Sequence, residues 1–498
     1  MYKRISQPSL LLAITLVAAL ISGCGAATDA SKSISRGAIN RGAIVPAESI
    51  RVNEYLNYYD QRFPEPVNQP LGLDLRLGNP HLPTSGGEIW LQIGLQTQHA
   101  ETESRTPLNL ALVLDVSGSM SSPDKMPYLK QSLMVFLGSL HPDDIVAIVA
   151  YSDDARLIRP AQNVGSGDWI RQTVEKLHPG GSTNLHAGLM LGLEQVDENF
   201  DIRFSNRVIL LTDGIANEGV TNADRIAADA LAYNNQGIHL STIGLGYDLN
   251  DHLLSTLARQ GKGAYHFVDS AQEMEKVFMQ EVEGLVEKVA AEVRVSIRPT
   301  WGVQLVSITG FDGHIPADGA QVLLQDMGAG DSQVIMVRLN GQSGSMGSMT
   351  IAEVTLQYTD VFAQKPREIY EAVTMRVVED GRYNPLEDIE VCRNATIVKS
   401  AEALKTISDL VDNGRFLDAW QLAYDIEAEL RRVASVTGDA QMVQDADLFQ
   451  RYLITLVTYL GYDPSEAQPT PLPLGEQPQR WGATPMPSME DLPTIEVQ

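Results

Sequence analysis

Asp115, Ser117 and Ser119 are the residues of this 498-residue chain whose types and spacing most directly suggest chemistry. They form an Asp-x-Ser-x-Ser loop, in which Gly118 lets the backbone turn all three side chains toward one point. The aspartate supplies an anionic oxygen and the serines supply neutral hydroxyl oxygens. Such oxygens are ligands for hard divalent cations, so the loop is a candidate for metal binding.

Two further loops carry oxygen donors that could complete such a site. The segment 180–184 (Gly-Gly-Ser-Thr-Asn) opens a predicted helix and offers the hydroxyl of Thr183. A buried strand predicted over 208–211 is followed by Thr212-Asp213-Gly214, which adds the carboxylate of Asp213. Because these loops contain no His or Cys, we expect Mg²⁺, or Mn²⁺ in its place. The expected metal ligands are Asp115, Ser117, Ser119, Thr183 and Asp213.

The elements that must position these residues alternate between short apolar strands and amphipathic helices from about residue 106 to 288. Strands are predicted over 110–114, 145–150, 208–211, 239–243 and 265–268, with helices between them and two more near 251–260 and 271–286. Continuous apolar strands joined by helices predict a mostly parallel sheet covered on both faces. Such sheets bind ligands at the C-terminal ends of their strands, where Asp115 and Asp213 lie.

Together, the five residues resemble the metal-ion-dependent adhesion site (MIDAS) of von Willebrand factor type A (VWA) domains, also found in integrin inserted domains. Asp115, Ser117 and Ser119 match its first motif, Thr183 the second and Asp213 the third, in that order. The resemblance implies a Rossmann-like fold and one metal with a coordination position open to a carboxylate of a partner protein. Residues 52–60 also resemble a stretch of bacterial envelope lipoproteins that carry this domain.

Loops around this site are expected to choose the partner: Ser121 to Asp124, Tyr151 to Asp154, and Ala216 to Val220. Serines and aspartates at strand ends also cap helices and form Asx turns, but the full five-residue set favours a metal site. His186, near Thr183, is interpreted as a residue of the helix surface.

Three function classes remain open: a metal-dependent binding or adhesion module, an enzyme such as a Mg²⁺-dependent hydrolase, and a structural scaffold of an envelope complex that uses its β or helical regions. The sequence contains no P-loop, no His-Glu-x-x-His and no Gly-x-Ser-x-Gly. A single metal without a nearby general base is a poor catalyst. We therefore expect a binding module and not an enzyme.

The N-terminus predicts export and lipidation. Lys3 and Arg4 precede a mostly apolar run from Leu10 to Ile21 that is too short to span a bilayer comfortably as a helix. It ends in Ile21-Ser22-Gly23-Cys24, which resembles a bacterial lipobox. A plain secretory signal with an incidental Cys is the alternative. We expect cleavage before Cys24, a lipid on its thiol, and an extracytoplasmic location in the cell envelope.

Charge limits the choice of partner further. The formal net charge of the chain is −26, which disfavours direct binding to nucleic acid or anionic lipid. The expected partners are a protein and, through the lipid on Cys24, the membrane. Cys392 is then a lone thiol, expected to be buried and inert.

The predicted fold is a multidomain α/β and β protein with a Rossmann-like VWA domain, an antiparallel β-domain and a C-terminal helical segment. The expected order is a signal peptide (1–23), a flexible tether (24–48), an N-terminal helix and strands (49–105), the VWA domain (106–288), the β-domain (289–380, paired with 70–100), a helical hairpin or bundle (385–462) and a Pro-rich disordered tail (463–498). Small polar residues predict the tether, and period-two apolar alternation predicts the β-domain.

Overall fold

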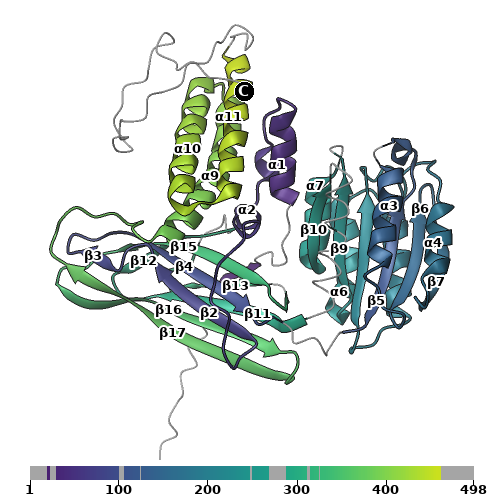
Figure 1. Ribbon diagram of the computed structural model, residues 1–498, viewed down its shortest axis with the longest axis horizontal. Helices are drawn as coiled ribbons and strands as arrows, with labels where there is room; N and C mark the ends of the chain where they lie inside the picture. The colour runs from purple at the N-terminus through teal and green to yellow at the C-terminus, as the bar shows by residue number, and fades with distance from the viewer. Residues whose placement is uncertain are drawn as a thin grey trace, which may run out of the picture. The chain divides into compact units, whose positions relative to one another are not determined.

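A computed structural model describes residues 19–22, 30–99, 106–123, 125–246, 249–268, 277, 288–310, 315–324 and 326–460. The chain divides into two compact units, one of residues 1–34 and 51–398, and one of residues 35–50 and 399–498. Each unit is described separately below (Figure 1).

The α/β domain of the first unit is built on a six-stranded sheet with strand order β10-β9-β8-β5-β6-β7. All neighbouring strands run parallel except β6 and β7, which are antiparallel. The strands are β5 (Leu108–Asp115), β6 (Ile145–Tyr151), β7 (Ala155–Asn163), β8 (Ser205–Thr212), β9 (His239–Leu245) and β10 (Lys262–Val268). The predicted α/β fold is therefore confirmed. Strand β7 was not predicted, because all nine of its residues are exposed or half-buried at this edge.

Helices cover both faces of this sheet. One apolar core holds side chains of α3 (Met126–Leu137) and α4 (Asp168–Glu175) against the sheet. The other holds side chains of α5 (Leu185–Asp197), α6 (Ala223–Gln236) and α7 (Asp251–Gln260). A short 3₁₀ helix, η2 (Gly118–Ser121), follows β5. The helix predicted near 271–286 lies almost entirely outside the described residues.

The β-domain consists of two sheets that share one apolar core. One sheet has the order β12-β15-β4-β2, and the other has the order β1-β13-β11-β16-β17-β3, with β14 paired to β11. The strands preceding the α/β domain are β1 (Ala19–Ser22), β2 (Leu71–Leu77), β3 (His81–Pro83) and β4 (Gly87–Thr97). Those following it are β11 (Lys288–Pro299), β12 (Val303–Ile308), β13 (Ala320–Leu323), β14 (Met327–Gly328), β15 (Ser332–Gly341), β16 (Gly347–Asp360) and β17 (Lys365–Val378). Since β4 pairs with β15 and β3 with β17, the α/β domain is inserted within the β-domain.

The prediction of a flexible tether is wrong for residues 30–40, which form helix α1 (Ala30–Asn40). A 3₁₀ helix, η1 (Ala47–Ser49), and helix α2 (Val52–Asn57) follow it. The first residues of α1 are buried, and the hydroxyl of Ser31 accepts the N–H of Arg51, which precedes α2, at 2.8 Å. The ammonium of Lys32 lies 4.0 Å from the ring centre of Tyr59 and 4.8 Å from that of Tyr58. Cation–π attraction and the small Ala30 and Ser31 thus order a segment whose composition alone offers no core.

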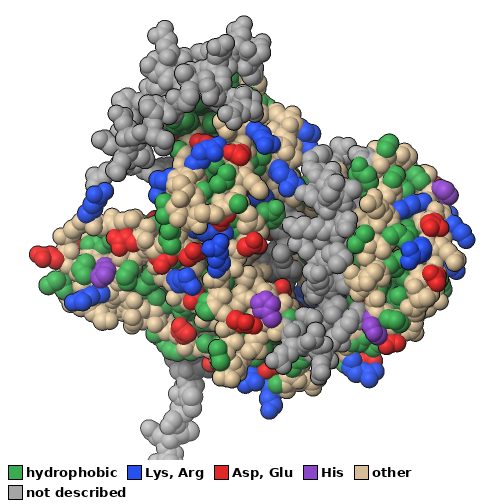
Figure 2. Space-filling view, viewed as in Figure 1, with side chains coloured by type: hydrophobic (Ala, Val, Ile, Leu, Met, Phe, Trp, Pro, Cys, Tyr) green, Lys and Arg blue, Asp and Glu red, His purple; other side chains and the backbone are tan. Residues whose placement is uncertain are grey.

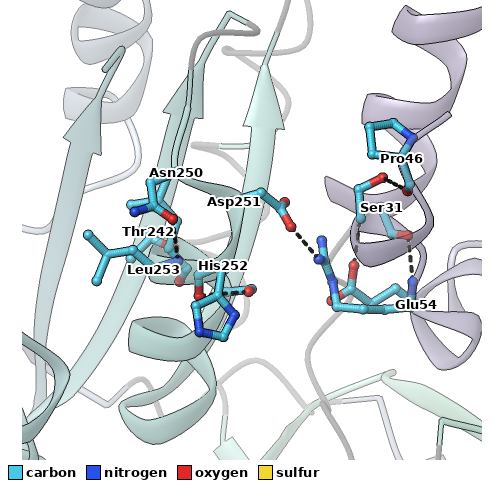
Figure 3. A network of polar contacts seen from close by, with 12 residues as sticks. Ser31, Pro46, Glu54, Thr242, Asn250, Asp251, His252 and Leu253 are labelled. Carbon is cyan, nitrogen blue, oxygen red and sulfur yellow. Dashed lines mark hydrogen bonds and ion pairs between the residues drawn. The ribbon is translucent and has the colours of Figure 1, made fainter. Parts of the chain in front are cut away.

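A polar network continues from this helix to α7 (Figure 3). The backbone N–H of Ser31 donates to Glu54. The guanidinium of Arg51 donates to Glu54 Oε1 at 2.6 Å and to Asp251 Oδ2 at 2.9 Å. Asp251 is the first residue of α7, so Arg51 joins the N-terminal segment to the α/β domain.

The second unit contains the C-terminal helices, α9 (Ile389–Asp412, which begins in the first unit), α10 (Phe416–Thr437) and α11 (Ala440–Tyr459). Gly438 ends α10 in the left-handed conformation, as expected of a helix C-terminus. The 35–50 segment packs on α11, where the N–H of Val45 donates to the hydroxyl of Tyr452. No helix in the described part of the chain is long and apolar enough to cross a bilayer. The apolar run of the predicted signal before residue 19, Cys24 and the Pro-rich tail lie outside it.

Candidate metal centre

The two carboxylates of the candidate site meet at one edge of the α/β sheet. Strands β5 and β8 are parallel neighbours, with Leu114 paired to Leu211. Asp115 is the last residue of β5, and Asp213 follows the last residue of β8. All eight residues of β5 are buried, so the apolar core on both faces holds this strand end in place.

Asp115 is fully buried and is held by three hydrogen bonds. Its Oδ1 accepts the backbone N–H of Ser117 at 2.8 Å, and its Oδ2 accepts the hydroxyls of Thr212 at 2.9 Å and Tyr151 at 3.4 Å. Burial raises the pKa of the Asp115 carboxyl, while the hydrogen bonds from Ser117 oppose the shift and the charge of Asp213 adds to it. Asp115 therefore shapes the loop that carries the two serines.

Three other oxygens form a continuous chain at this edge. The hydroxyl oxygens of Ser117 and Ser119 lie 3.0 Å apart. Ser119 donates to Asp213 Oδ1 at 2.7 Å. In an ideal octahedron around Mg²⁺, with bonds of 2.0–2.1 Å, adjacent ligand oxygens lie about 2.9 Å apart. The separations of 3.0 and 2.7 Å are close to that edge length, so each neighbouring pair of oxygens could occupy adjacent positions around Mg²⁺.

Thr183 is held beside this chain by backbone contacts. The carbonyl oxygens of Gly181 and Val116 accept from the N–H groups of Gly118 and Gly180 at 2.9 and 2.8 Å, which ties the 180–184 loop to the serine loop. The N–H of Thr183 donates to Asn217 Oδ1 at 2.8 Å. Within the described residues, the Thr183 hydroxyl is not hydrogen-bonded to the other four predicted ligands.

Gly181 is required by the backbone at this point. Its φ of +88° lies in the left-handed region, and a Cβ there would stand 2.9 Å from both carboxylate oxygens of Asp153. Asp153 accepts the N–H and hydroxyl of Ser182 at 2.7 and 2.6 Å, which lowers the pKa of Asp153. Asp153 thus secures the loop next to Thr183.

Lys125 is a member of the site that the sequence did not reveal. It precedes α3, and its ammonium donates to Asp213 Oδ2 at 2.9 Å. Tyr151 and Thr212, which bind Asp115, were also missed as site residues. The register of the strands accounts for both hydroxyls, because Tyr151 pairs with Asp115 and Thr212 follows Leu211, the partner of Leu114. Lys125 lies in a loop ten positions after Asp115, and no pattern in the sequence indicates that it reaches the site.

The donor set is therefore two carboxylates and three hydroxyls, with one ammonium beside them. Within the described ranges, no group of three or more His, Cys, Asp or Glu side chains could hold a metal. Hydroxyl and carboxylate oxygens suit Mg²⁺ or Mn²⁺ better than softer metals. Of the loops expected to choose the partner, only Asp124 lies outside the described residues. His186 contacts Asp229 on α6 at 3.0 Å and takes no part in the site.

Comparison with known proteins supports the domain assignment. Residues 109–280 match the family model for the von Willebrand factor type A domain. A structure described as von Willebrand factor type A from Catenulispora acidiphila superposes with a TM-score of 0.51 at 18% identity, covering 76% of this chain and 89% of that one. The α/β domain therefore has the fold of a VWA domain.

The similarity to two curated relatives extends beyond this domain. YfbK, an uncharacterized protein of Escherichia coli (strain K12), is 28% identical over 331 residues, covering 63% of this chain and 57% of its own. The mouse inter-alpha-trypsin inhibitor heavy chain 4 is 26% identical over 300 residues, covering 57% of this chain and 30% of its own. The chain thus spans just over half of the first relative and less than a third of the second.

Proposed function

We propose that the VWA domain is a metal-dependent module that captures a protein ligand. VWA domains commonly serve protein–protein interaction or adhesion, and the matched segment contains the whole candidate site. The observation that carries the proposal is the chain of oxygens from Ser117 through Ser119 to Asp213, with separations of 3.0 and 2.7 Å. These oxygens lie at the strand edge where open parallel sheets bind ligands.

Ser117, Ser119 and Asp213 would hold the ion, with Thr183 joining from the neighbouring loop. Asp115 would act through its hydrogen bonds to the Ser117 backbone and to Thr212. A bound Mg²⁺ would supply an electrophilic position that a carboxylate of the partner can fill. The protein's own contribution is to hold neutral hydroxyls in place, so that the ion keeps enough charge to attract that carboxylate.

A binding role agrees better with the surroundings than catalysis does. The phenol of Tyr151 is fully buried, and burial raises its pKa well above the usual value. The ammonium of Lys125 is paired with Asp213. Neither group is poised to act as a general base. The names of the relatives described above designate no enzyme.

The proposed setting is the outer side of a bacterial membrane, with a lipid on Cys24. The basic Lys3 and Arg4, the apolar run and the Cys24 motif support this placement. On the face drawn in Figure 2, acidic and basic side chains are intermixed over the described surface, and the net charge is −26. This acidity supports a protein ligand over nucleic acid.

The lipid is tested with Cys24→Ser. Incorporation of labelled fatty acid and recovery in the membrane fraction should both be lost. Retention of the label on the Cys24→Ser chain would reject lipidation at this residue.

Partner capture is tested by affinity purification from an envelope extract. The experiment has four arms: the unsubstituted chain in Mg²⁺, the unsubstituted chain in EDTA, Asp213→Ala in Mg²⁺, and Asp224→Ala in Mg²⁺. Asp224, on the exposed start of α6, serves as the control position. A protein retained by the unsubstituted and Asp224→Ala chains in Mg²⁺, and lost in the other two arms, supports the proposal. Equal capture in all four arms would move the contact surface away from this site.

A further inference from the structure

Lys125 reaches the carboxylate on which metal binding would depend. Its ammonium lies 2.9 Å from Asp213 Oδ2, and Ser119 takes the other oxygen, Oδ1. The side chain of Asp213 is fully buried and that of Lys125 is 21% exposed. Both oxygens of Asp213 are thus engaged within the domain. The Ser119 hydroxyl on Oδ1 could itself be a metal ligand, whereas the Lys125 ammonium on Oδ2 would repel a metal ion.

The position of Lys125 is supported by its surroundings. Gly246, at the end of β9, has a φ of +80°, and a Cβ there would stand 3.6 Å from Lys125 Cε. The lysine stem therefore runs beside the backbone of the β9–α7 loop. From there the ammonium reaches Asp213 Oδ2 at 2.9 Å.

Electrostatics make this contact consequential for a divalent ion. Asp115 and Asp213 would give the site a charge of −2 when ionised, and Lys125 reduces it to −1. Because Asp115 and Asp213 are 0% and 1% exposed, water and salt screen these charges poorly. A divalent ion placed among Ser117, Ser119 and Asp213 would share one carboxylate with the ammonium and would be repelled by it.

We propose that Lys125 is an internal competitor that weakens metal binding, so that firm retention of the ion requires a carboxylate from the ligand. This inference rests on the proposed metal site and deepens it. The incoming carboxylate restores the charge that Lys125 removes, so ligand and metal bind cooperatively. The domain then holds its ion tightly only while it holds a partner.

The test measures Mn²⁺ binding to the purified full chain by electron paramagnetic resonance, with and without acetate as the probe carboxylate. Two variants remove the charge: Lys125→Met, and Lys125→Gln, which keeps a hydrogen-bond donor for Asp213. Lys125→Arg keeps the charge. Lys130→Met is the matched control, because Lys130 lies in the first turns of α3, close in sequence to Lys125, and donates to the carbonyl oxygen of Glu175 at the surface.

We expect Lys125→Met and Lys125→Gln to bind Mn²⁺ at least tenfold more tightly than the unsubstituted chain, with Lys125→Arg and Lys130→Met within about twofold of it. Acetate should tighten binding to the unsubstituted chain more than to Lys125→Gln. If Lys125→Met and Lys125→Gln both melt near the temperature of the unsubstituted chain and bind Mn²⁺ equally or more weakly, the proposed role of Lys125 is overturned while the metal site stands. Absence of Mn²⁺ binding in every chain overturns the metal site itself.

Discussion

Replacing Gly181 by alanine tests whether the backbone of the Thr183 loop is as constrained as the structure indicates. At φ +88°, an alanine occupies the left-handed region, which costs about 1–2 kcal/mol for a residue with a Cβ. The new Cβ would also stand 2.9 Å from both oxygens of Asp153 and push that side chain away from Ser182. Stability and the position of Thr183 should change together.

The neighbouring glycine provides the control. Gly180 lacks the left-handed backbone conformation, and a Cβ there meets nothing within 4 Å. Differential scanning calorimetry of the full chain in EDTA should place the melting temperature of Gly181→Ala about 3–6 °C below the unsubstituted value, and that of Gly180→Ala within about 1 °C of it. Mn²⁺ affinity should fall about tenfold for Gly181→Ala only. Equal effects of the two substitutions would refute the reasoning.

Three further predictions concern buried polar groups. Asp115→Ala removes the acceptor for Ser117, Thr212 and Tyr151, and should lower the free energy of unfolding by about 2 kcal/mol in urea titrations with EDTA; a more stable variant would contradict this. Arg51→Met leaves Glu54 and Asp251 without their shared cation and should cost about 3 kcal/mol in the same assay, whereas Arg225→Met, at an exposed pair with Asp229, should have no measurable effect. Burial raises the pKa of Tyr452 from 10.0 to about 12. The protonated phenol therefore contributes fully to the stability of the fold below pH 10, and this contribution is lost as the pH rises through about 12. The helical circular dichroism signal should decline less over this range in Tyr452→Phe than in the unsubstituted chain, and an identical decline would reject the assignment.

The parts of the fold that follow from sequence are those in which burial leaves a periodic pattern. The apolar runs that became β5, β6, β8 and β9 are buried on both sides, and their order with the intervening helices indicates a parallel sheet. Strand β7 is mostly exposed and leaves no such pattern. Helix α1 was missed because Lys32 and the tyrosines that surround it are distant in sequence, so their attraction is invisible in local composition.

The candidate site divides in the same way. Asp115 and Asp213 could be assigned to one edge because they follow parallel strands, and the structure places them there with Ser117 and Ser119 between them. The position of Thr183 depends on the side-chain oxygen of Asn217, which accepts its N–H, and on the bond from Gly118 to Gly181, and no spacing in the sequence reveals either contact. Lys125 could not be found, because the reach of a long side chain from a loop to Asp213 leaves no spacing pattern in the sequence. Its contact with Asp213 changes the expected strength of metal binding.

The most direct test of the central claim is anomalous diffraction from crystals of the full chain grown with Mn²⁺ and a carboxylate. One strong peak is expected among the oxygens of Ser117, Ser119 and Asp213, and it should be lost in crystals of Asp213→Ala. A peak elsewhere on the domain, or none at this strand edge while the side chains keep their positions, would contradict it.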